Sequence, residues 1–345
     1  MVRMSLIAAA LLAVTAPCLT AQSALPEAEE WTWSANRPDA NATIGVIGAR
    51  TLAATELEIT YRFEQLNSQG VWFGSDSLNL ETTLDVYDDA PLNLSDIRHH
   101  VRIAYGITDN LTIMARGEFA VLERATIANN GLLRTGVNDF GDVHAGLMYS
   151  IYSSGPYRLQ LEAGGVIPTG ASTTYADTTA AQTGTETPLP YDMRPGGGTF
   201  AATGGISGTV QNEWGSLGAQ FRLRANLGQN DAGFTPGDQY LANGWAAYNI
   251  NQSISVSAGV RWENWDNIDG GDDRLNQFGD PHNNGGILAG QRASMPVGIN
   301  LMMPEDSRLA GHRLSLEAVY ALHHDYEGPQ LGLDWGVNVG WTVAF

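Results

Sequence analysis

Residues 101–119 read VRIAYGITDNLTIMARGEF, and this stretch decides the fold class. Apolar side chains occupy every second position on both sides of a short polar break, which is the repeat of a β-strand and not of a helix. The break itself, Thr108-Asp109-Asn110, has the composition of a tight turn. The stretch therefore predicts an antiparallel hairpin with one apolar and one polar face.

The same alternation recurs along the chain as far as Phe345. We expect twelve such strands, near residues 56–64, 101–107, 111–119, 143–151, 157–167, 199–210, 217–224, 239–248, 254–263, 295–301, 314–320 and 331–345. A count of fourteen stays open, because residues 43–53 and part of 67–97 could add a pair.

The connections between these strands alternate in length. Tight turns follow the even-numbered strands, with a moderate one at 304–311, and long connections follow the odd-numbered strands at 67–97, 121–138, 169–195, 228–237 and 264–291. Short turns on one rim and long loops on the other are typical of outer-membrane barrels. We predict an all-β chain: a transmembrane antiparallel β-barrel with short periplasmic turns, long extracellular loops and both termini in the periplasm.

Three segments are expected. Residues 1–21 have the features of a cleaved signal peptide, with Arg3 before an apolar run too short to span a bilayer. Residues 22–54 lack a strand pattern and form either a periplasmic tail or a segment folded into the lumen. Residues 55–345 form the barrel. We expect the chain in a bacterial outer membrane, in contact with its lipid, with the strand ending at Phe345 presented to the outer-membrane assembly machinery.

Charge excludes one class of function and suggests where the arginines point. The chain is acidic, with a formal charge of −19, which argues against nucleic-acid binding, and it contains no lysine. The arginines inside the expected strands all share the polar face, and a lipid-facing arginine at the bilayer midplane would cost ~2–4 kcal/mol. We therefore expect a lumen lined by Glu58, Arg62, Arg102, Arg116, Glu118, Arg158, Glu162, Arg222, Arg224, Arg261, Glu263, Arg313 and Glu317.

Buried charges of this kind need partners, so we expect cross-strand ion pairs among these residues. Arg116, Arg222 and Arg224 in particular should each lie near a carboxylate such as Glu118, Glu162 or Asp142. The set could select solutes in an open lumen or fill a closed one with salt bridges, and the sequence leaves both open.

Catalysis and metal binding find little support in the sequence. The single cysteine, Cys18, lies in the expected signal peptide, and no zinc motif, phosphate-binding loop or Ser-His arrangement on the apolar face is present. The aspartate-rich loop 265–273 lacks the terminal glutamate of an EF-hand and is interpreted as a solvated turn. His282 and the pairs at 99–100 and 323–324 are expected at the outer rim. We expect no enzyme activity, cofactor or metal.

Five stretches carry a family resemblance: 44–48 (IGVIG), 189–199 (LPYDMRPGGGT), 228–234 (GQNDAGF), 311–314 (GHRL) and 327–331 (EGPQL). The chain resembles the outer-membrane β-barrel transporters grouped with the meta-pathway phenol-degradation proteins. The resemblance implies transport of small molecules, including hydrophobic or aromatic compounds. Relatives carry a histidine-rich segment after the first motif, but here Ala49-Arg50-Thr51-Leu52 follows, which weakens any metal-related role. The alternative is a structural or surface-interaction barrel with a plugged lumen.

Overall fold

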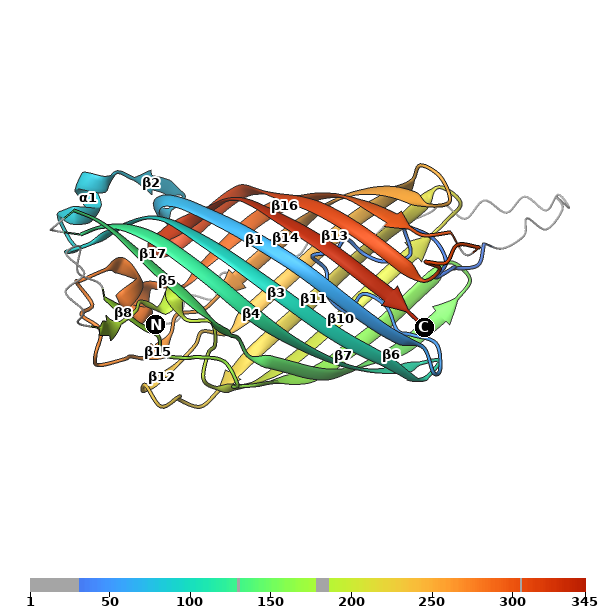
Figure 1. Ribbon diagram of the computed structural model, residues 1–345, viewed down its shortest axis with the longest axis horizontal. Helices are drawn as coiled ribbons and strands as arrows, with labels where there is room; N and C mark the ends of the chain where they lie inside the picture. The colour runs from blue at the N-terminus through green and yellow to red at the C-terminus, as the bar shows by residue number, and fades with distance from the viewer. Residues whose placement is uncertain (1–30, 129–130, 178–185, 305) are drawn as a thin grey trace, which may run out of the picture. The chain divides into compact units, whose positions relative to one another are not determined.

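A closed antiparallel sheet dominates the computed structural model, which describes residues 31–128, 131–177, 186–304 and 306–345. The expected signal peptide lies outside the described residues. Neighbouring strands of the wall follow the order β17-β16-β14-β13-β11-β10-β7-β6-β4-β3-β1, and β1 pairs with β17 to close the ring (Figure 1). The wall strands are β1 (Leu57–Gly74), β3 (Ala90–Thr108), β4 (Leu111–Ala128), β6 (Val143–Ser154), β7 (Tyr157–Ile167), β10 (Phe200–Gln211), β11 (Gly215–Leu227), β13 (Gln239–Asn249), β14 (Ile254–Trp265), β16 (Gly290–Met302) and β17 (His312–Ala344).

β17 crosses the wall twice. Its first part, residues 313–326, pairs with β16, and its second part, 326–344, pairs with β1. The backbone N–H of Ala344 donates to the carbonyl of Gly311 at 3.1 Å, so the two ends of β17 meet at one rim. β17 is therefore a hairpin, and the eleven assigned wall strands cross the barrel twelve times, as the alternation in the sequence predicted.

The remaining elements lie in the connections at the end of the barrel away from Phe345, which we call the loop rim (Figure 1). They are β2 (Asp76–Leu78), α1 (Leu80–Leu84), β8 (Tyr175–Asp177), β9 (Glu186–Pro188), β12 (Phe234–Thr235), β15 (Asp269–Gly270) and the short 3-10 helices η1 (Tyr191–Met193), η2 (Pro281–Asn283) and η3 (Gly285–Ile287). The opposite end, with the short connections, is the turn rim. β5 (Gly131–Phe140) continues β6 after a break at Gly141-Asp142, since both pair with β4.

Two connections expected as long loops are largely strand, and those predictions were wrong. β1 runs on to Gly74 and β3 begins at Ala90, which shortens the first loop, and β4 and β5 extend as a hairpin through most of 121–138. Beyond the bilayer a strand needs no apolar outer face, so the period-two signal fades there although the strand continues.

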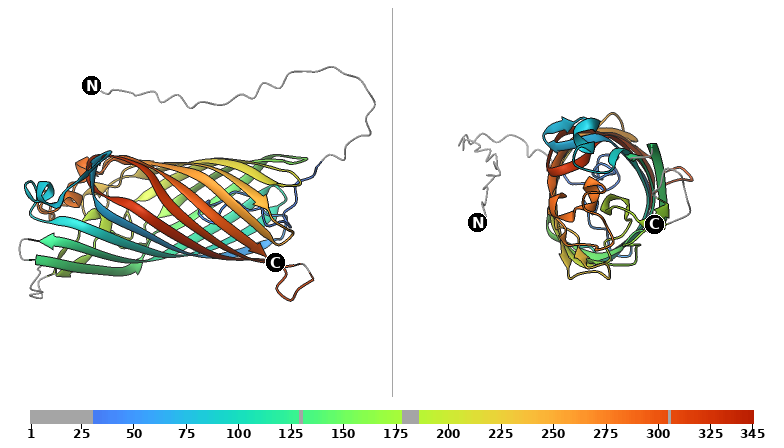
Figure 2. Two further views of the ribbon diagram at one scale, coloured as in Figure 1. Left: turned by 90° about the horizontal axis from the view of Figure 1, so that it is seen from above. Right: turned by 90° about the vertical axis from the view of Figure 1, so that its left-hand side faces the viewer.

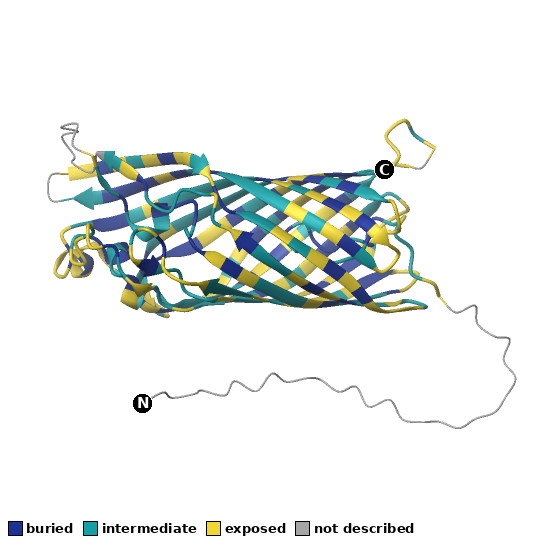
Figure 3. Ribbon diagram, turned by 90° about the horizontal axis from the view of Figure 1, so that it is seen from below, coloured by how far each residue is buried: buried dark blue, intermediate teal, exposed yellow. Residues whose placement is uncertain are grey.

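Alternating burial along the strands defines the two faces of the wall (Figure 3). On β3, Ile103 is 49% exposed while its neighbour Ala104 is 2% exposed. The outward side chains are mainly apolar, whereas inward positions carry residues such as Thr112, Asn300 and Asn338. No helix among the described residues is long and apolar enough to cross a membrane.

A charged side chain should affect stability differently on the two faces of the wall. Leu161 on β7 faces outward and is 43% exposed, so Leu161→Arg should destabilise the barrel by about 2–4 kcal/mol in lipid. Leu161→Met is the matched control, and the measurement is the urea midpoint of unfolding from lipid vesicles, read by heat-modifiable gel mobility. An arginine variant as stable as the methionine variant would contradict the assignment of this face to lipid.

Candidate functional site

Residues 31–56 enter the barrel from the turn rim: residues 37–52 lie inside it, and the two ends, 31–36 and 53–56, include the exposed positions at that rim. They appear in dark blue within the ring of strands when the barrel is seen from the loop rim (Figure 2). We call them the N-terminal segment. Wall side chains from several strands bind its backbone: Ser255 and Ser216 donate to the carbonyls of Pro38 (3.0 Å) and Asp39 (2.7 Å), Gln220 and Gln160 donate to those of Ile47 (2.7 Å) and Gly48 (2.8 Å), and Thr112 accepts from the N–H of Leu52 (2.8 Å). Because the wall backbone is engaged in its own ladder, side chains carry out most of this binding.

Charged groups add to this anchoring. Arg50 of the N-terminal segment pairs with Glu58 of β1 at 2.8 Å and with Glu56 at 3.1 Å. Glu317, which is 1% exposed, accepts from the N–H of Gly45 at 3.4 Å. The contacts with Glu58 and Glu317 join the segment to β1 and β17, whereas the contact with Glu56 lies within the segment.

Two wall glycines let the segment approach closely. A Cβ on Gly106 would lie 1.8 Å from the carbonyl oxygen of Ala53, and a Cβ on Gly340 would lie 2.4 Å from Cδ1 of Ile44. The first clash involves backbone, which cannot rotate away as a side chain could. Gly106 is therefore part of the seat of the N-terminal segment.

The candidate lumen residues all lie on the inward face, most of them in ion pairs. The pairs within 4.0 Å are Arg102–Glu58, Arg62–Glu64, Arg98–Glu118, Arg222–Glu162, Arg224–Asp142, Arg261–Glu317 and Arg292–Glu263. The partners expected for Arg222 and Arg224 are present, at 2.6 and 3.6 Å. Arg158 and Arg313 instead donate to backbone carbonyls, of Gly155 and Tyr157 and of Arg37.

Arg116 departs from the expected pattern. No carboxylate among the described residues lies within 4.0 Å of its guanidinium, so the expected ion pair is absent, although Glu118 lies near enough to act on Arg116 through its charge. The cross-strand neighbours explain this result, because Arg116 faces Arg102 on β3 and His144 on β6. The two-residue alternation placed the side chain correctly on the inward face, but the register of strand pairing decides which residues lie beside it.

Two histidines expected at the outer rim have buried roles. His100 is 5% exposed and lies between Glu64 (3.0 Å) and Glu118 (3.3 Å) inside the wall. His282 is also 5% exposed, and its Nε2 accepts from the N–H of Leu331 at 3.3 Å. Among the residues that the structure describes, no group of three or more His, Cys, Asp or Glu side chains is arranged to hold a metal ion.

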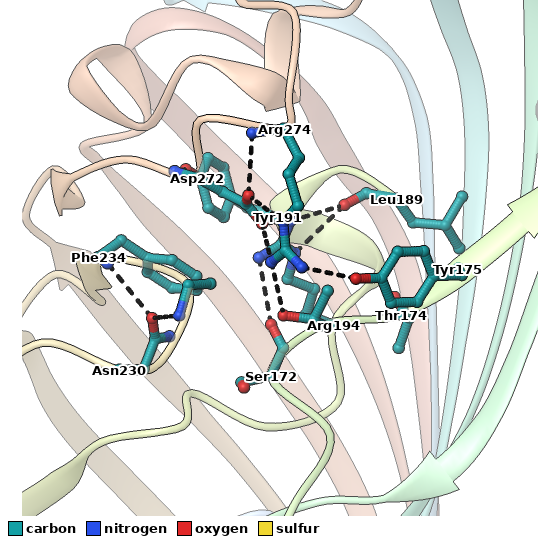
Figure 4. Close-up of polar contacts among 12 residues, drawn as sticks. Ser172, Thr174, Tyr175, Leu189, Tyr191, Arg194, Asn230, Phe234, Asp272 and Arg274 are labelled. Atoms are coloured by element: carbon teal, nitrogen blue, oxygen red, sulfur yellow. Dashed lines mark hydrogen bonds and ion pairs between the residues drawn. The ribbon is translucent and has the colours of Figure 1, made fainter. Parts of the chain in front are cut away.

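A largely buried cluster joins the connections at the loop rim to one another (Figure 4). Arg194, between β9 and β10, pairs with Asp272 at 3.0 Å, and Arg274 pairs with the same carboxylate at 2.7 Å. The guanidinium of Arg194 also lies over the rings of Tyr191 (4.7 Å) and Phe234 (5.2 Å). The loop was interpreted as a solvated turn, which holds for its exposed residues such as Asp266 and Asp269 but was wrong for Asp272, which is 5% exposed. We call these joined connections the cap.

A second set of ion pairs joins the cap to the inner wall. Arg124 of β4 pairs with Asp280 at 2.6 Å and with Asp192 at 3.2 Å. Burial by itself would raise the pKa of Asp280, but Arg124 and His282 outweigh it and hold that pKa well below its ordinary value. Leu189 and Met193 of the cap pack against inward residues of β4 and β5, namely Ala120, Leu122 and Val137. Sequence reasoning missed Arg124 because it placed the residue in a loop. Arg124 nevertheless lies an even number of residues after Arg116, so both side chains point to the same face of β4.

Similar solved structures are outer-membrane barrels. The COG4313 outer membrane channel from Pseudomonas putida F1 matches with a TM-score of 0.59 and 12% identity, over 87% of this chain and 99% of that chain. Weaker matches, below a TM-score of 0.5, include the translocator domain of the autotransporter NalP from Neisseria meningitidis (0.45, 12% identity, 86% and 91% covered) and the CymD monoaromatic hydrocarbon channel (0.37, 10% identity, 85% and 89% covered).

No protein-family model matches the chain, and no curated protein matches it. The resemblance to the phenol-degradation group therefore rests on the short motifs alone. At 12% identity the likeness to the Pseudomonas channel establishes the fold, which is that of an outer-membrane β-barrel.

The cap should respond to pH through Asp89, whose N–H donates to the carbonyl of Gly279 at 2.8 Å. Burial, together with the nearby charges of Asp280 and Asp88, raises the pKa of Asp89 to about 6. A raised carboxyl pKa means that the protonated form stabilises the folded cap, and this contribution is lost as pH rises through about 6. Hydrogen exchange at residues 88–89 and 278–280, corrected for the intrinsic rate, should accelerate between pH 5 and pH 7.

Asp89→Asn should abolish that acceleration, whereas Asp76→Asn, at an exposed position of β2, should retain it. The same pH response in Asp89→Asn and in the parent would assign it to another group.

The seat of the N-terminal segment is tested at Gly106. Gly106→Ala should displace residues 52–55 and raise hydrogen exchange across 43–54, because the new Cβ meets the Ala53 carbonyl. Gly117→Ala on β4 is the matched control, since a Cβ there meets nothing within 4 Å. Equal protection in the two variants would mean that the segment is not seated against β3.

Proposed function

We propose that this protein is an outer-membrane channel for small molecules that is closed in the structure and conducts when the N-terminal segment leaves the lumen. The observation that carries the proposal is the charged inner wall. Ion pairs such as Arg222–Glu162 and Arg224–Asp142 face the lumen. Charges in a permanently filled core keep a desolvation cost that well-packed apolar residues would avoid, whereas charges along a path that fills with water do not.

The way in which the segment is held supports the same proposal. Wall serine and glutamine side chains bind its carbonyls, and these bonds can be exchanged for water without opening the wall. The ladder that closes the barrel between β1 and β17 does not involve the segment. Removal of the segment therefore leaves an intact ring with a polar interior.

The substrate class follows from the lining. Family resemblance implies hydrophobic or aromatic compounds, but the inner wall, as far as the structure describes it, presents arginines paired with carboxylates. We propose small polar solutes, with a preference for anions that the arginines confer. Electrostatic potentials in a confined lumen act on the permeating ion at close range, so a few charges decide the selectivity.

A closed barrel is the second candidate, favoured by a specific observation. The cap is tied by ion pairs whose side chains are almost fully buried, Arg194–Asp272 and Arg124–Asp280. A cap that never opens would leave a structural or surface-interaction barrel, whose loop rim forms the contact surface.

Planar-bilayer recordings separate the two functions. We expect rare or small openings from the parent chain and a much larger, frequent conductance from a variant that lacks residues 31–50. The control for folding is heat-modifiable mobility of both proteins. Absence of conductance in the deletion variant, with the fold retained, would favour the closed barrel.

Selectivity tests the role of the arginines. Arg222→Gln with Arg224→Gln leaves Glu162 and Asp142 uncompensated, so the reversal potential should shift toward cation selectivity. Arg134→Gln, at an exposed position of β5, removes a positive charge outside the lumen and should leave selectivity unchanged. Breaking a buried pair costs about 3–5 kcal/mol, so unfolding is measured on the same variants. Lower stability with unchanged selectivity would leave the two arginines as scaffolding.

A further inference from the structure

A small cavity separates the N-terminal segment from the wall. It has a volume of about 70 Å³ and lies between residues 41–50 and strands β1, β3 and β4. This volume accommodates a few water molecules or one small oxyanion. Four arginines line the cavity, Arg50, Arg62, Arg102 and Arg116, with Glu58 as the one carboxylate of the lining.

Three of these arginines form ion pairs, but Arg116 does not, and Glu118 and Glu64 act on its charge only from beyond 4.0 Å. Glu58 pairs with both Arg50 and Arg102, Glu56 pairs with Arg50 again, and Glu64 pairs with Arg62 from outside the lining. Three carboxylates therefore pair with three of the four arginines. The guanidinium of Arg116 has no carboxylate within 4.0 Å among the residues that the structure describes.

Strand register makes the excess charge more costly. Arg116 on β4 lies directly opposite Arg102 on β3, and both face the lumen. Like charges at directly opposed positions of a sheet destabilise it. An anion between the two guanidinium groups would convert this repulsion into attraction.

Buried polar atoms without hydrogen-bond partners also line this cavity. Three lining atoms of the N-terminal segment are buried and have no hydrogen-bond partner in the described part of the chain: the Thr43 hydroxyl, the Arg50 Nε and the Asn41 Oδ1. The first two are donors, and the third is an acceptor whose amide can be turned to offer its N–H instead. Thr43 is 2% exposed, so bulk water does not serve it. Buried donors left unpaired carry a penalty of about 1–3 kcal/mol each. An oxyanion offers the acceptor oxygens that these donors lack.

We propose that this cavity binds one small oxyanion, a carboxylate or an inorganic phosphate, held by Arg116 from the wall and by Arg50 and Thr43 from the N-terminal segment. Because its ligands come from both the wall and the N-terminal segment, the anion bridges the two and stabilises the seated segment by mass action. The site does not depend on whether the barrel conducts. In a conducting barrel the same anion would favour the closed state, since it binds only when segment and wall are together.

Hydrogen exchange of residues 41–52 tests the site without any transport assay. The purified full-length mature chain in detergent is titrated separately with acetate and with inorganic phosphate. Ionic strength is held constant with gluconate, which is too large for a cavity of about 70 Å³. We expect a saturable slowing of exchange, and comparison of the two titrations identifies which oxyanion the site prefers.

Variants identify the ligands. Arg116→Gln leaves no carboxylate without its partner, so the fold should persist, and the half-saturating concentration should rise about tenfold or more, as loss of a charged hydrogen bond predicts. Thr43→Val should weaken binding by a smaller factor, Arg116→Lys should retain part of it, and Arg134→Gln should behave as the parent. The proposal is overturned if exchange does not slow saturably with either anion, if gluconate slows it equally, or if Arg116→Gln and Arg134→Gln respond alike.

Discussion

Everything in this structure follows from one constraint: no backbone N–H or C=O group can face lipid without a hydrogen-bond partner. The sheet must therefore close, which it does through the pairing of β1 with β17. Closure fixes the alternation of the side chains, so the apolar ones meet lipid and the polar ones meet the lumen. A closed ladder also leaves the wall little free backbone with which to bind a segment inside the barrel; Gly106, near the turn rim, is one residue that does so. Side chains take over that task, as the serines and glutamines that bind Pro38, Asp39, Ile47 and Gly48 show.

The charged and polar groups of the interior then need partners, and three parts of the structure supply them. Ion pairs along the inner wall, some between neighbouring strands and some across an intervening strand, neutralise most inward charges. The N-terminal segment fills the space toward the turn rim and supplies Arg50 to Glu58. The cap fills the loop rim through Arg194–Asp272 and Arg124–Asp280. Arg116 is the place where compensation by the chain itself is incomplete, and an external anion is the simplest physical remedy.

The alternation of apolar and polar side chains along the sequence was sufficient to predict the barrel, its twelve crossings and the inward direction of the arginines. It is a reliable signal because a polar side chain that faces lipid destabilises the barrel. It failed where that penalty is absent. Beyond the bilayer, β4 and β5 continue without an apolar face, so Arg124 was assigned to a loop. The N-terminal segment shows no period at all, because its partners are single side chains spread around a ring and not a neighbouring strand. Pairing was predictable only in part: Arg222 has its expected carboxylate, but the register sets Arg116 against Arg102.

The central claim is that residues 37–52 of the N-terminal segment occupy the lumen and contact the inner wall. An ideal Cβ on Gly340 lies 3.6 Å from the Cβ of Ile44, within the range that a disulfide requires. In a chain free of Cys18, Ile44→Cys with Gly340→Cys should form an intramolecular disulfide under mild oxidation, measured by gel mobility with and without reductant. Ile44→Cys with Val339→Cys should not, because Val339 is 43% exposed on the outer face. Efficient cross-linking of the first pair alone is the predicted result, and no cross-link in a folded barrel, or equal cross-linking of both pairs, would contradict the account.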